Sequence, residues 1–359
     1  MCGTQTSTDV AFVGLGGWGT QRADNVRSLG HTVVAGVDTV RESREKFATT
    51  FDADTYEHYE ELPYDELDAV VIGTPNKFHA EAAITALESG VYTYVAKPMA
   101  RDVKDAESML DAERESEAFG MVGFNSRFST AATFCKAYAR EGWFGEFTHV
   151  ETYTLRRRGI PGVGSWFTDL ELAGGGALID IGVHAIDRTL YFLDFPDVLD
   201  VVGTTRSNFG GEDDYVDPDR WSQHWDTSAH SFEVDDSASA FVRFVDGASY
   251  SLEVAWADNR TDEYRTIVRG TKAGATMDVE GPPLVLHDTR RTGTDHYFDV
   301  DVTGDVERTG HEAALHLFFE AVTSNEKPEH CTFEEAIVSQ RIIEAIYESS
   351  ETDRPVRFD

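Results

Sequence analysis

Three groups of residues in this chain combine side-chain types and spacing that can do chemistry. Asp180 and His184 lie four residues apart in an apolar stretch with helical periodicity, so both face one side of that helix and can point at one hydroxyl group. Two further groups, Thr74-Pro75-Asn76 with His79 and Lys97-Pro98, follow apolar runs that are typical of strands. Ligands of open α/β sheets bind beyond the carboxyl ends of the strands, so we expect these groups to meet a ligand there.

A glycine-rich turn follows the first apolar run of the chain. In GLGGWG, Gly14 permits a tight turn, Gly16 lets the backbone approach a pyrophosphate, and Gly19 lets the following helix pack on the strand. The N-terminus of that helix then points at the anion. We expect Gly17 and Trp18 to contact the nucleotide as well, while a turn that serves packing alone is the alternative.

Asp38 ends the next apolar run, about 20 residues after Gly19, which is the usual spacing of an acidic residue that binds a ribose 2′-hydroxyl. Its negative charge would repel a 2′-phosphate and so favours NAD over NADP. Arg41 and Arg44 follow closely, and either one could turn toward such a phosphate. The sequence therefore predicts a site for NAD or NADP, with a preference for NAD.

These residues need a parallel sheet to bring them together, and the first part of the chain has the pattern of one. Short runs rich in Val, Ile and Ala alternate with helical patterns from residue 9 to about 125. The runs are DVAFVG, TVVAGVD, AVVIGT, VYTYVA and MVGFN. Such runs are typical of strands buried on both faces, which predicts a doubly wound α/β domain of the Rossmann type over residues 1–126.

The pattern changes beyond about residue 145. The stretches FTHVETYTL, ASAFVRFVDGASYSLEVAWA and EYRTIVRG alternate in polarity and are separated by glycine turns, which predicts a largely antiparallel sheet in a second domain over 127–359. A long helix is expected at 177–193, and two more at 310–323 and 333–350. The glycines at 174–176 let the helix at 177 begin close to another backbone or a ligand.

Composition excludes several classes of partner. The formal net charge is −34, and such a field repels nucleic acid and anionic membranes. A hydrophobic content of 41% is enough for packed cores, so we expect a folded acidic protein. The scarcity of Lys beside Arg resembles a halophilic protein of a haloarchaeal cytosol, where molar salt screens self-repulsion; an ordinary acidic protein is the alternative.

Cysteine, metal and targeting signals are weak. Cys2, Cys135 and Cys331 are too few and too far apart for a disulfide framework or a cysteine zinc site. The acidic residues Asp213, Asp214, Asp217 and Asp219 lack a complete ligand spacing, so we expect no required metal. We read no signal peptide and no membrane span, and expect a cytoplasmic protein.

The motifs together resemble those of the Gfo/Idh/MocA family, which is named after glucose-fructose oxidoreductase, inositol dehydrogenase and rhizopine catabolism. GLGGWG, VVIGTPNKFHAEAAITALESG, AKPMA, MVGFNSRFS and GGGALIDIGVHAIDRTLYFLD occur in the family's order over nearly the whole chain. The resemblance implies NAD(P)-dependent oxidation or reduction of sugar and polyol hydroxyls. It also implies a C-terminal domain with an open, mostly antiparallel sheet that binds substrate and joins subunits into a homodimer or homotetramer.

The resemblance places catalysis at three residues. Oxidation of a secondary alcohol requires a base for the hydroxyl proton, and we expect His184 to take this role. Lys97 matches the lysine of the family's Glu-Lys-Pro motif and would hydrogen-bond the same oxygen, while Asp180 would orient the hydroxyl or the imidazole.

Ala96 replaces the glutamate of that motif, which in the family lies near the cofactor ribose. Two other functions therefore stay open. One is a sugar-to-sugar oxidoreductase with tightly bound NAD(P), and the other is a non-catalytic, nucleotide-binding regulator that senses sugars. The retained Lys97, Asp180 and His184 argue against the regulator.

Arginines are the candidates for recognising an acidic group of the substrate. In the run Arg156-Arg157-Arg158, the first and third would share one face of a strand, and an arginine fork binds carboxylate, phosphate or sulfonate. Ion pairing with the surplus carboxylates is the alternative reading. A sugar acid is therefore a possible substrate beside neutral sugars and polyols.

Other side chains are candidates for lining the substrate pocket, namely Asn125, Arg127 and Trp166. In the long loop at 205–235, Trp221 and Trp225 could stack on a sugar or cover a subunit contact. Asp187, one turn beyond His184, is expected on the helix surface or in a buried pair.

Overall fold

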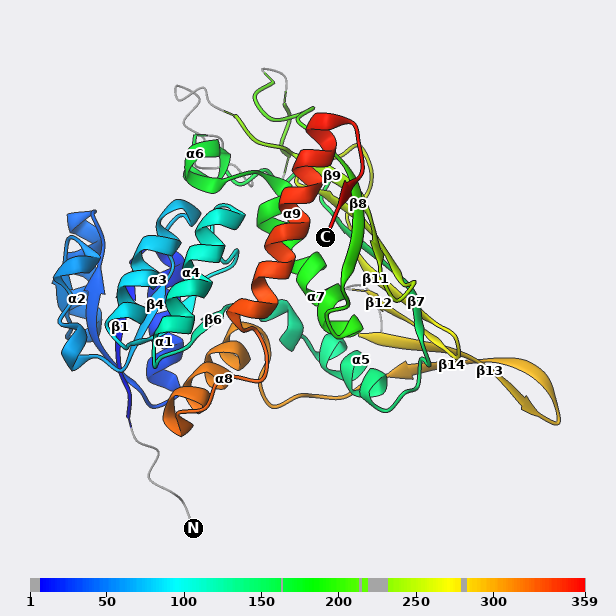
Figure 1. The fold of residues 1–359 in the computed structure, drawn as a ribbon, viewed down its shortest axis with the longest axis horizontal. Helices are drawn as coiled ribbons and strands as arrows, with labels where there is room; N and C mark the ends of the chain where they lie inside the picture. The colour runs from blue at the N-terminus through cyan, green and yellow to red at the C-terminus, as the bar shows by residue number, and fades with distance from the viewer. Residues whose placement is uncertain (1–6, 163, 213–214, 219–231, 279–282, 359) are drawn as a thin grey trace, which may run out of the picture. The chain divides into compact units, whose positions relative to one another are not determined.

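The structure is a computed structural model, and it describes residues 7–162, 164–212, 215–218, 232–278 and 283–358 (Figure 1). The chain divides into two compact units by its internal contacts. The first contains residues 1–125 and 310–340, and the second contains residues 126–309 and 341–359. The sequence predicts a division between residues 126 and 127, with 127–359 as one domain; the contacts group 310–340 with the first unit.

The first unit is built on a parallel sheet of six strands in the order β3-β2-β1-β4-β5-β6. The strands are β1 (Asp9–Val13), β2 (Thr32–Val37), β3 (Asp54–Tyr56), β4 (Ala69–Ile72), β5 (Tyr92–Val95) and β6 (Gly120–Val122). The helices of this unit include α1 (Gly17–Ser28), α2 (Arg41–Phe51), α3 (His79–Glu88), α4 (Val103–Glu115) and α8 (Gly310–Ser324). This strand order is that of the doubly wound Rossmann fold, which confirms the predicted fold class.

The central strands are apolar on both faces because helices cover both sides of the sheet. Every residue of β4 is buried, as are Val10, Ala11 and Phe12 of β1. The sequence pattern did not predict β3, which has only three residues, none of them buried.

The second unit contains a sheet of nine strands in the order β14-β13-β12-β11-β7-β10-β9-β8-β15. All neighbouring pairs are antiparallel except β7 and β10, which run parallel. The strands are β7 (Phe147–Leu155), β8 (Val198–Arg206), β9 (Ser237–Phe244), β10 (Ser249–Ala255), β11 (Glu263–Gly270), β12 (Gly274–Asp278), β13 (Leu284–Thr292), β14 (Thr294–Val302) and β15 (Val356–Arg357). The predicted, mostly antiparallel sheet is therefore confirmed.

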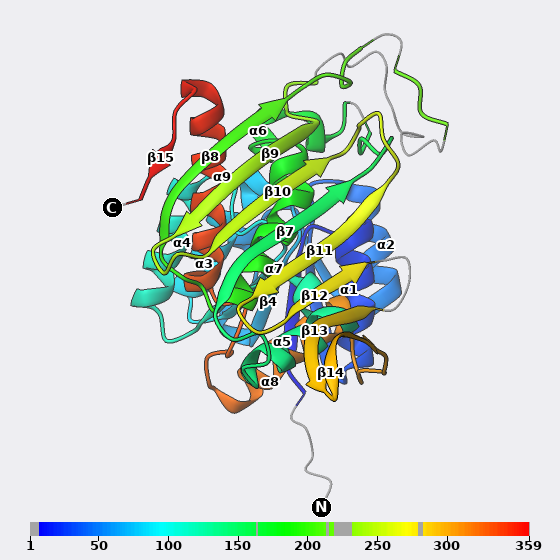
Figure 2. The ribbon, with the colours of Figure 1, turned by 90° about the vertical axis from the view of Figure 1, so that its right-hand side faces the viewer.

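Helices of the second unit pack on one face of this sheet. They are α5 (Thr130–Arg140), the short α6 (Leu170–Ala173), a π-helical turn η6 (Leu178–Gly182) that continues into α7 (Val183–Leu193), and the C-terminal part of α9 (Phe333–Thr352). Helices α5 and α7 contact the sheet directly. Figure 2 looks onto the opposite face, where no helix of the described residues crosses the strands of the sheet.

A buried ion pair fixes the position of α7 in the second unit. Arg127 donates to both carboxylate oxygens of Asp187, at 2.8 and 2.5 Å, and their side chains are 1% and 0% exposed. The rings of Tyr191 and Phe195 each lie 5.1 Å from the guanidinium carbon. Asp187 is thus in a buried pair, one of its two expected places, and Arg127 is packed in the interior where the sequence suggested a pocket wall.

We expect Asp187→Asn to lower the free energy of unfolding by about 3–5 kcal/mol, because it leaves a buried guanidinium without its counter-charge. Urea unfolding followed by tryptophan fluorescence measures the change. The matched control is Asp295→Asn, which removes a carboxylate from an exposed pair with Arg291 and should cost about 1 kcal/mol or less. Equal losses in the two variants would contradict a structural role for the buried pair.

Candidate active site

The turn between β1 and α1 is shaped by close backbone approaches. Gly14 has a φ of +94°, and a Cβ atom on it would lie 2.7 Å from the carbonyl oxygen of Gly73. A Cβ on Gly19 would overlap the carbonyl oxygen of Gly14. Beside Gly16 and Gly17, in contrast, no atom lies within 4 Å of the added Cβ, so space remains above the N-terminus of α1.

Asp38 holds this turn against the end of β2. Its carboxylate accepts hydrogen bonds from the backbone N–H groups of Leu15 and Val40, both at 2.8 Å. Arg41, a predicted cofactor contact, is exposed and pairs with Glu45 at 2.7 Å. Arg44 instead donates to the carbonyl oxygen of Asp38 at 2.6 Å.

Trp18 packs closely on the end of β4. A Cβ on Gly73 would overlap its indole ring. The His311 ring meets Trp18 edge to face with centroids 6.1 Å apart, and the Arg22 guanidinium lies 5.6 Å from the indole centroid. Trp18 therefore packs beside the glycine turn. The two residues that contact its indole ring are Arg22 of α1 and His311 of α8.

His79 joins the two strand-end loops that the sequence assigned to ligand binding. Its Nε2 lies 2.9 Å from the carbonyl oxygen of Thr74, and its Nδ1 lies 3.0 Å from that of Pro98. The ring is 1% exposed, and burial lowers the pKa of His79, which favours the neutral ring. A neutral imidazole has one N–H and donates to one of these carbonyls at a time. His79, predicted as a cofactor contact, thus bonds the protein backbone.

Lys97 lies on the loop that His79 holds. The backbone N–H of Ala96 donates to the carbonyl oxygen of Ile72 at 2.8 Å and so aligns the loop with the end of β4. Lys97, the next residue, is half-buried. The peptide bond between Lys97 and Pro98 is cis. Asn76, on the neighbouring loop, is buried.

Two observations, besides the strand order, indicate that the first unit can hold a dinucleotide. Space is left beside Gly16 and Gly17, where a pyrophosphate would meet the N–H groups of the first turn of α1. The hydroxyl oxygen of Thr74 is buried and has no hydrogen-bond partner among the described residues. A bound ribose or carboxamide group could satisfy that hydroxyl.

Asp180 and His184 belong to the second unit, on the helix that begins as η6 and continues as α7. Asp180 and His184 are partly exposed in a stretch from 177 to 190 that is otherwise buried except for Arg188, so the two share one partly exposed helix face. Arg188, one turn further, donates to the hydroxyl of the buried Thr266 on β11 at 2.8 Å. The indole N–H of Trp256 donates to Oδ2 of Asp180 at 2.9 Å. A π-helical turn inside an α-helix is frequent at functional sites, and here it carries Asp180.

The arginine run does not continue the strand as expected. Strand β7 ends at Leu155, and the side chains of the three arginines that follow contact strand β11 and neighbouring loops. Arg156 donates to the hydroxyl of Tyr264 at 3.0 Å, and Arg157 donates to the carbonyl oxygen of Arg260 at 3.0 Å. Arg158 donates to the carbonyl oxygens of Val216 and Asp258, at 2.9 and 3.0 Å. Among the described residues, the partners of these three side chains include the Tyr264 hydroxyl, backbone carbonyl oxygens and the amide oxygen of Asn259, 3.1 Å from Arg158.

The other predicted substrate residues lie in both units. Trp166, in the second, is half-buried and stacks on Phe167 with centroids 3.9 Å apart. Asn125, the last residue before the division, has a buried side-chain oxygen without a partner among the described residues. Trp221, Trp225, Asp213, Asp214 and Asp219 lie outside the described residues.

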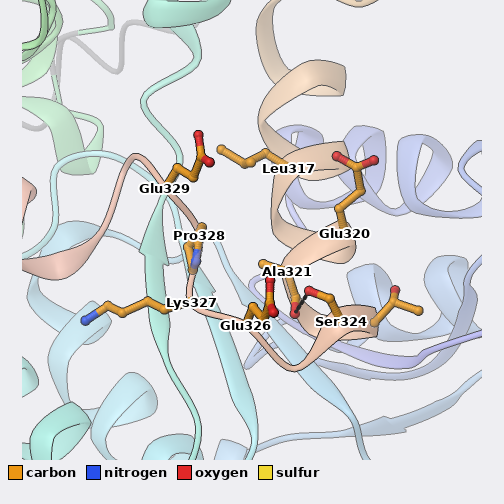
Figure 3. A pocket seen from close by; sticks show the side chains of 9 residues that line it. Leu317, Glu320, Ala321, Ser324, Glu326, Lys327, Pro328 and Glu329 are labelled. Carbon is orange, nitrogen blue, oxygen red and sulfur yellow. Dashed lines mark hydrogen bonds between the residues drawn. The ribbon is translucent and has the colours of Figure 1, made fainter.

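Two hollows are lined by described residues, and one of them includes Arg158, a predicted substrate residue. One, of about 300 Å³, is lined by Arg158, Phe209 and Tyr215 among others, with the guanidinium over both rings. The other lies at the C-terminal end of α8, where Glu320, Glu326 and Glu329 surround an open depression (Figure 3). No predicted catalytic or cofactor residue lines either hollow.

The described residues hold neither a metal-binding cluster nor a membrane-spanning helix. No group of three or more His, Cys, Asp or Glu side chains there is arranged to hold a metal ion. No helix in the described ranges is long and apolar enough to cross a membrane.

Several residues that shape the site were not predicted from the sequence. Trp256 directly follows β10. A buried indole N–H usually has a polar partner, so a tryptophan just after a predicted strand could have been read as a hydrogen-bond donor near the site. Asp235 and Tyr347 hold the start of η6, but they are far from it in sequence and no local pattern marks them.

Comparison with known proteins identifies the family. Residues 8–124 match the family described as "Oxidoreductase family, NAD-binding Rossmann fold", and residues 134–276 match the "GFO/IDH/MocA C-terminal domain". The chain belongs to the Gfo/Idh/MocA family. The resemblance read from its motifs is thereby confirmed, and with it an NAD(P)-dependent oxidoreductase of a family that acts on sugars and polyols.

Relatives of the Gfo/Idh/MocA chain include named sugar dehydrogenases. It is 30% identical to D-glucoside 3-dehydrogenase of Escherichia coli, over 81% of this chain and 79% of the relative. It is 28% identical to D-xylose 1-dehydrogenase [NADP(+)] of Haloarcula marismortui, over 99% of this chain and 95% of the relative. The fold matches levoglucosan dehydrogenase in complex with NADH and levoglucosan, with a TM-score of 0.82, 21% identity and coverage of 98% and 99%.

We expect His311 to make this oxidoreductase less stable as the pH falls. Burial, and then the charges of Arg22 and Lys97, lower the pKa of His311 to about 4. Between that pH and about 6.5 the unfolded chain binds a proton that the folded chain does not, so stability falls as the pH drops through this range. His311→Gln removes this contribution, and its melting temperature should decline less between pH 7 and pH 5 than that of the wild type.

The control is His296→Gln, which removes an exposed histidine of β14. Melting curves at several pH values, at constant salt, give the slopes for the three proteins. A slope for His311→Gln equal to that of the wild type would contradict the expectation.

Proposed function

We propose that the chain transfers a hydride between NAD(P) and a secondary hydroxyl or hemiacetal carbon of a sugar, polyol or sugar acid. The observation that supports this most strongly is that Asp180 and His184 share one partly exposed helix face, with the carboxylate of Asp180 accepting from the indole N–H of Trp256. A carboxylate and an imidazole four residues apart on one accessible helix face can bind one hydroxyl group together. The relatives that act on glucosides, xylose and levoglucosan support the substrate class.

In this proposal each residue has one task. The bound nicotinamide supplies the hydride acceptor. His184 takes the hydroxyl proton, and Asp180, oriented by the indole N–H of Trp256, holds the hydroxyl or the imidazole in place. Lys97 hydrogen-bonds the reacting oxygen and stabilises the negative charge that develops on it. His79 holds the loop that carries Lys97 through the carbonyl oxygen of Pro98, and so fixes the backbone from which the lysine side chain extends.

The proposed base is tested with His184→Ala. Absorbance of reduced nicotinamide is followed with NAD and NADP, against aldoses, polyols and sugar acids, in molar KCl and in dilute buffer. We expect kcat/KM to fall by about 10²-fold or more, because a positioned base contributes that much to proton transfer. The control His287→Ala removes a histidine from the hairpin of β13 and β14 and should keep wild-type activity.

Other results would lead to the alternatives. Turnover that His184→Ala retains would contradict the proposed base. Wild-type protein that binds nucleotide and turns over no substrate of the panel would support the sugar-sensing regulator. NAD(P) that copurifies with the protein, together with reduction of one sugar at the expense of another, would support the sugar-to-sugar oxidoreductase.

We also propose that NAD is preferred over NADP. The support is Asp38, whose carboxylate stands beside the glycine turn at the end of β2, where its charge would oppose a 2′-phosphate. The exposed Arg41 is engaged by Glu45, and Arg44 by the carbonyl oxygen of Asp38.

Asp38→Asn tests the preference, because it removes the charge and keeps one acceptor oxygen for the backbone. We expect the ratio of kcat/KM with NADP to that with NAD to rise by about tenfold or more, which corresponds to about 1.4 kcal/mol less repulsion. Asp52→Asn removes the same charge from the C-terminal end of α2 and should leave the ratio unchanged. An unchanged ratio in Asp38→Asn would contradict the proposal.

Three further proposals concern the surroundings of the protein. A net charge of −34 and the relative from Haloarcula support a salt-adapted, cytoplasmic haloarchaeal protein. Val202 and Phe241, paired across β8 and β9, are 47% and 42% exposed, which supports a homodimer or homotetramer formed through the sheet. Melting curves and light scattering in molar KCl and in dilute buffer test salt dependence and assembly.

A further inference from the structure

We propose that Asp235 is a positioning residue that holds the helix carrying Asp180 and His184 in its working orientation. The inference rests on the proposed function, because it assigns Asp235 a task in the same reaction. Asp235 lies two residues before β9 and is 7% exposed. It acts through the backbone of the helix and has no contact with the reacting groups in this assignment.

Three consecutive N–H groups at the start of the helix donate to Asp235. The N–H of Gly176 donates to Oδ1 at 2.7 Å, and that of Leu178 to Oδ2 at 2.8 Å. The N–H of Ala177, between them, donates to the carbonyl oxygen of Asp235 at 2.9 Å. The first N–H groups of a helix have no partner within the helix, and three fixed donors define both the position and the rotation of the first turn.

Two glycines make this contact possible. A Cβ on Gly176 would overlap the carbonyl oxygen of Asp235, and a Cβ on Gly175 would overlap the hydroxyl of Tyr347. Tyr347, on α9, donates that hydroxyl to Oδ1 of Asp235 at 2.7 Å. The start of the helix therefore packs against Asp235 and Tyr347 without room for a side chain at either glycine.

Asp236, which follows Asp235, supports Asp180 by a second route, through Trp256. The carbonyl oxygen of Asp236 accepts from the N–H of Trp256 at 2.8 Å, and the indole N–H of Trp256 donates to Asp180. Within the helix, the N–H of Asp180 donates to Gly176 at 2.9 Å. Adjacent residues 235 and 236 thus fix Asp180 through its own helix and through the tryptophan that holds its carboxylate.

An aspartate meets this set of donors better than its amide. Burial raises the pKa of Asp235, and the donors from Leu178, Tyr347 and Gly176 oppose that rise by stabilising the ionised form. In Asp235→Asn one oxygen becomes an NH₂ group that cannot accept a hydrogen bond. One backbone N–H at the helix start then loses its partner, and fewer contacts hold the first turn.

The test compares Asp235→Asn with a control that makes the same chemical change elsewhere. Glu113 in the first unit is also buried and accepts from a backbone N–H, that of Gly120 at 2.8 Å, and from Lys327 at 3.1 Å. Glu113→Gln should lower the melting temperature without changing kcat. It therefore separates the loss of a buried carboxylate from the loss of orientation at the site.

We expect Asp235→Asn to lower kcat by about 10- to 10²-fold, since small misplacements of reacting groups cost that much. The dissociation constant for NADH, measured by fluorescence, should stay within about twofold of wild type. With substrate deuterated at the reacting carbon, the kinetic isotope effect on kcat should rise. Hydrogen exchange of the segment 174–183, measured by mass spectrometry without substrate, should become faster in Asp235→Asn and remain slow in Glu113→Gln.

A second variant covers the case in which Asp235→Asn does not fold. Tyr347→Phe removes one hydrogen bond and leaves the backbone donors, so kcat and exchange should lie between wild type and Asp235→Asn. Wild-type kcat in Asp235→Asn, or unchanged exchange of 174–183, would overturn the inference. In Tyr347→Phe, wild-type values of both kcat and exchange would also overturn it. Absence of turnover in the wild type would overturn the proposed function instead, and the exchange experiment would still report on the role of Asp235.

Discussion

The candidate site depends on backbone segments that approach so closely that only glycine fits between them. Gly14 and Gly19 bring the first turn of α1 against the ends of β1 and β4, and Gly176 brings the start of η6 against Asp235. In both units the approach leaves the N-terminal N–H groups of a helix directed at one place. In the first unit that place is open and suits a phosphate, whereas in the second it is filled by a buried carboxylate of the protein. One structural device thus binds a ligand in one unit and anchors a helix in the other.

Charge is used in different ways at the surface and in the interior. The excess of acidic residues gives the chain its net charge of −34, and an exposed pair such as Arg291 with Asp295 contributes little to stability. The buried groups, in contrast, each have defined partners: Arg127 with Asp187, Asp235 with Tyr347 and two backbone N–H groups. Because burial of an unpaired charge is costly, these pairs determine how α7 and η6 are placed in the second unit.

The groups that the proposed reaction uses belong to both units. The first has the features of a dinucleotide site and carries Lys97 on a loop that His79 secures. The second carries Asp180 and His184 on a helix whose start is bonded to Asp235, and Trp256, which holds Asp180, is bonded to Asp236. More residues of the site position other groups than are proposed to touch substrate. This is expected where reacting groups must be held within a fraction of an ångström.

Much of the fold could be predicted from local sequence patterns. Buried parallel strands read as continuous apolar runs, and the sequence-derived segments 147–155 and 263–270 coincide with β7 and β11. The short β3 and the mostly exposed strands β13 and β14 were not predicted, because strands with few buried residues have no apolar pattern to detect. The glycine turn, Asp38 and the spacing of Asp180 and His184 were visible for the same local reason.

Only the tertiary structure decided which of the candidate residues serve as supports. His79 joins two loops, and Arg158 donates hydrogen bonds to loop carbonyl oxygens. Burial and partners distant in sequence determine these roles of polar side chains. Trp256, Asp235 and Tyr347 meet the helix start from positions between about 55 and 170 residues further along the chain. Sequence patterns report periodicity over a few turns or strands, and contacts at such separations arise only when the chain has folded.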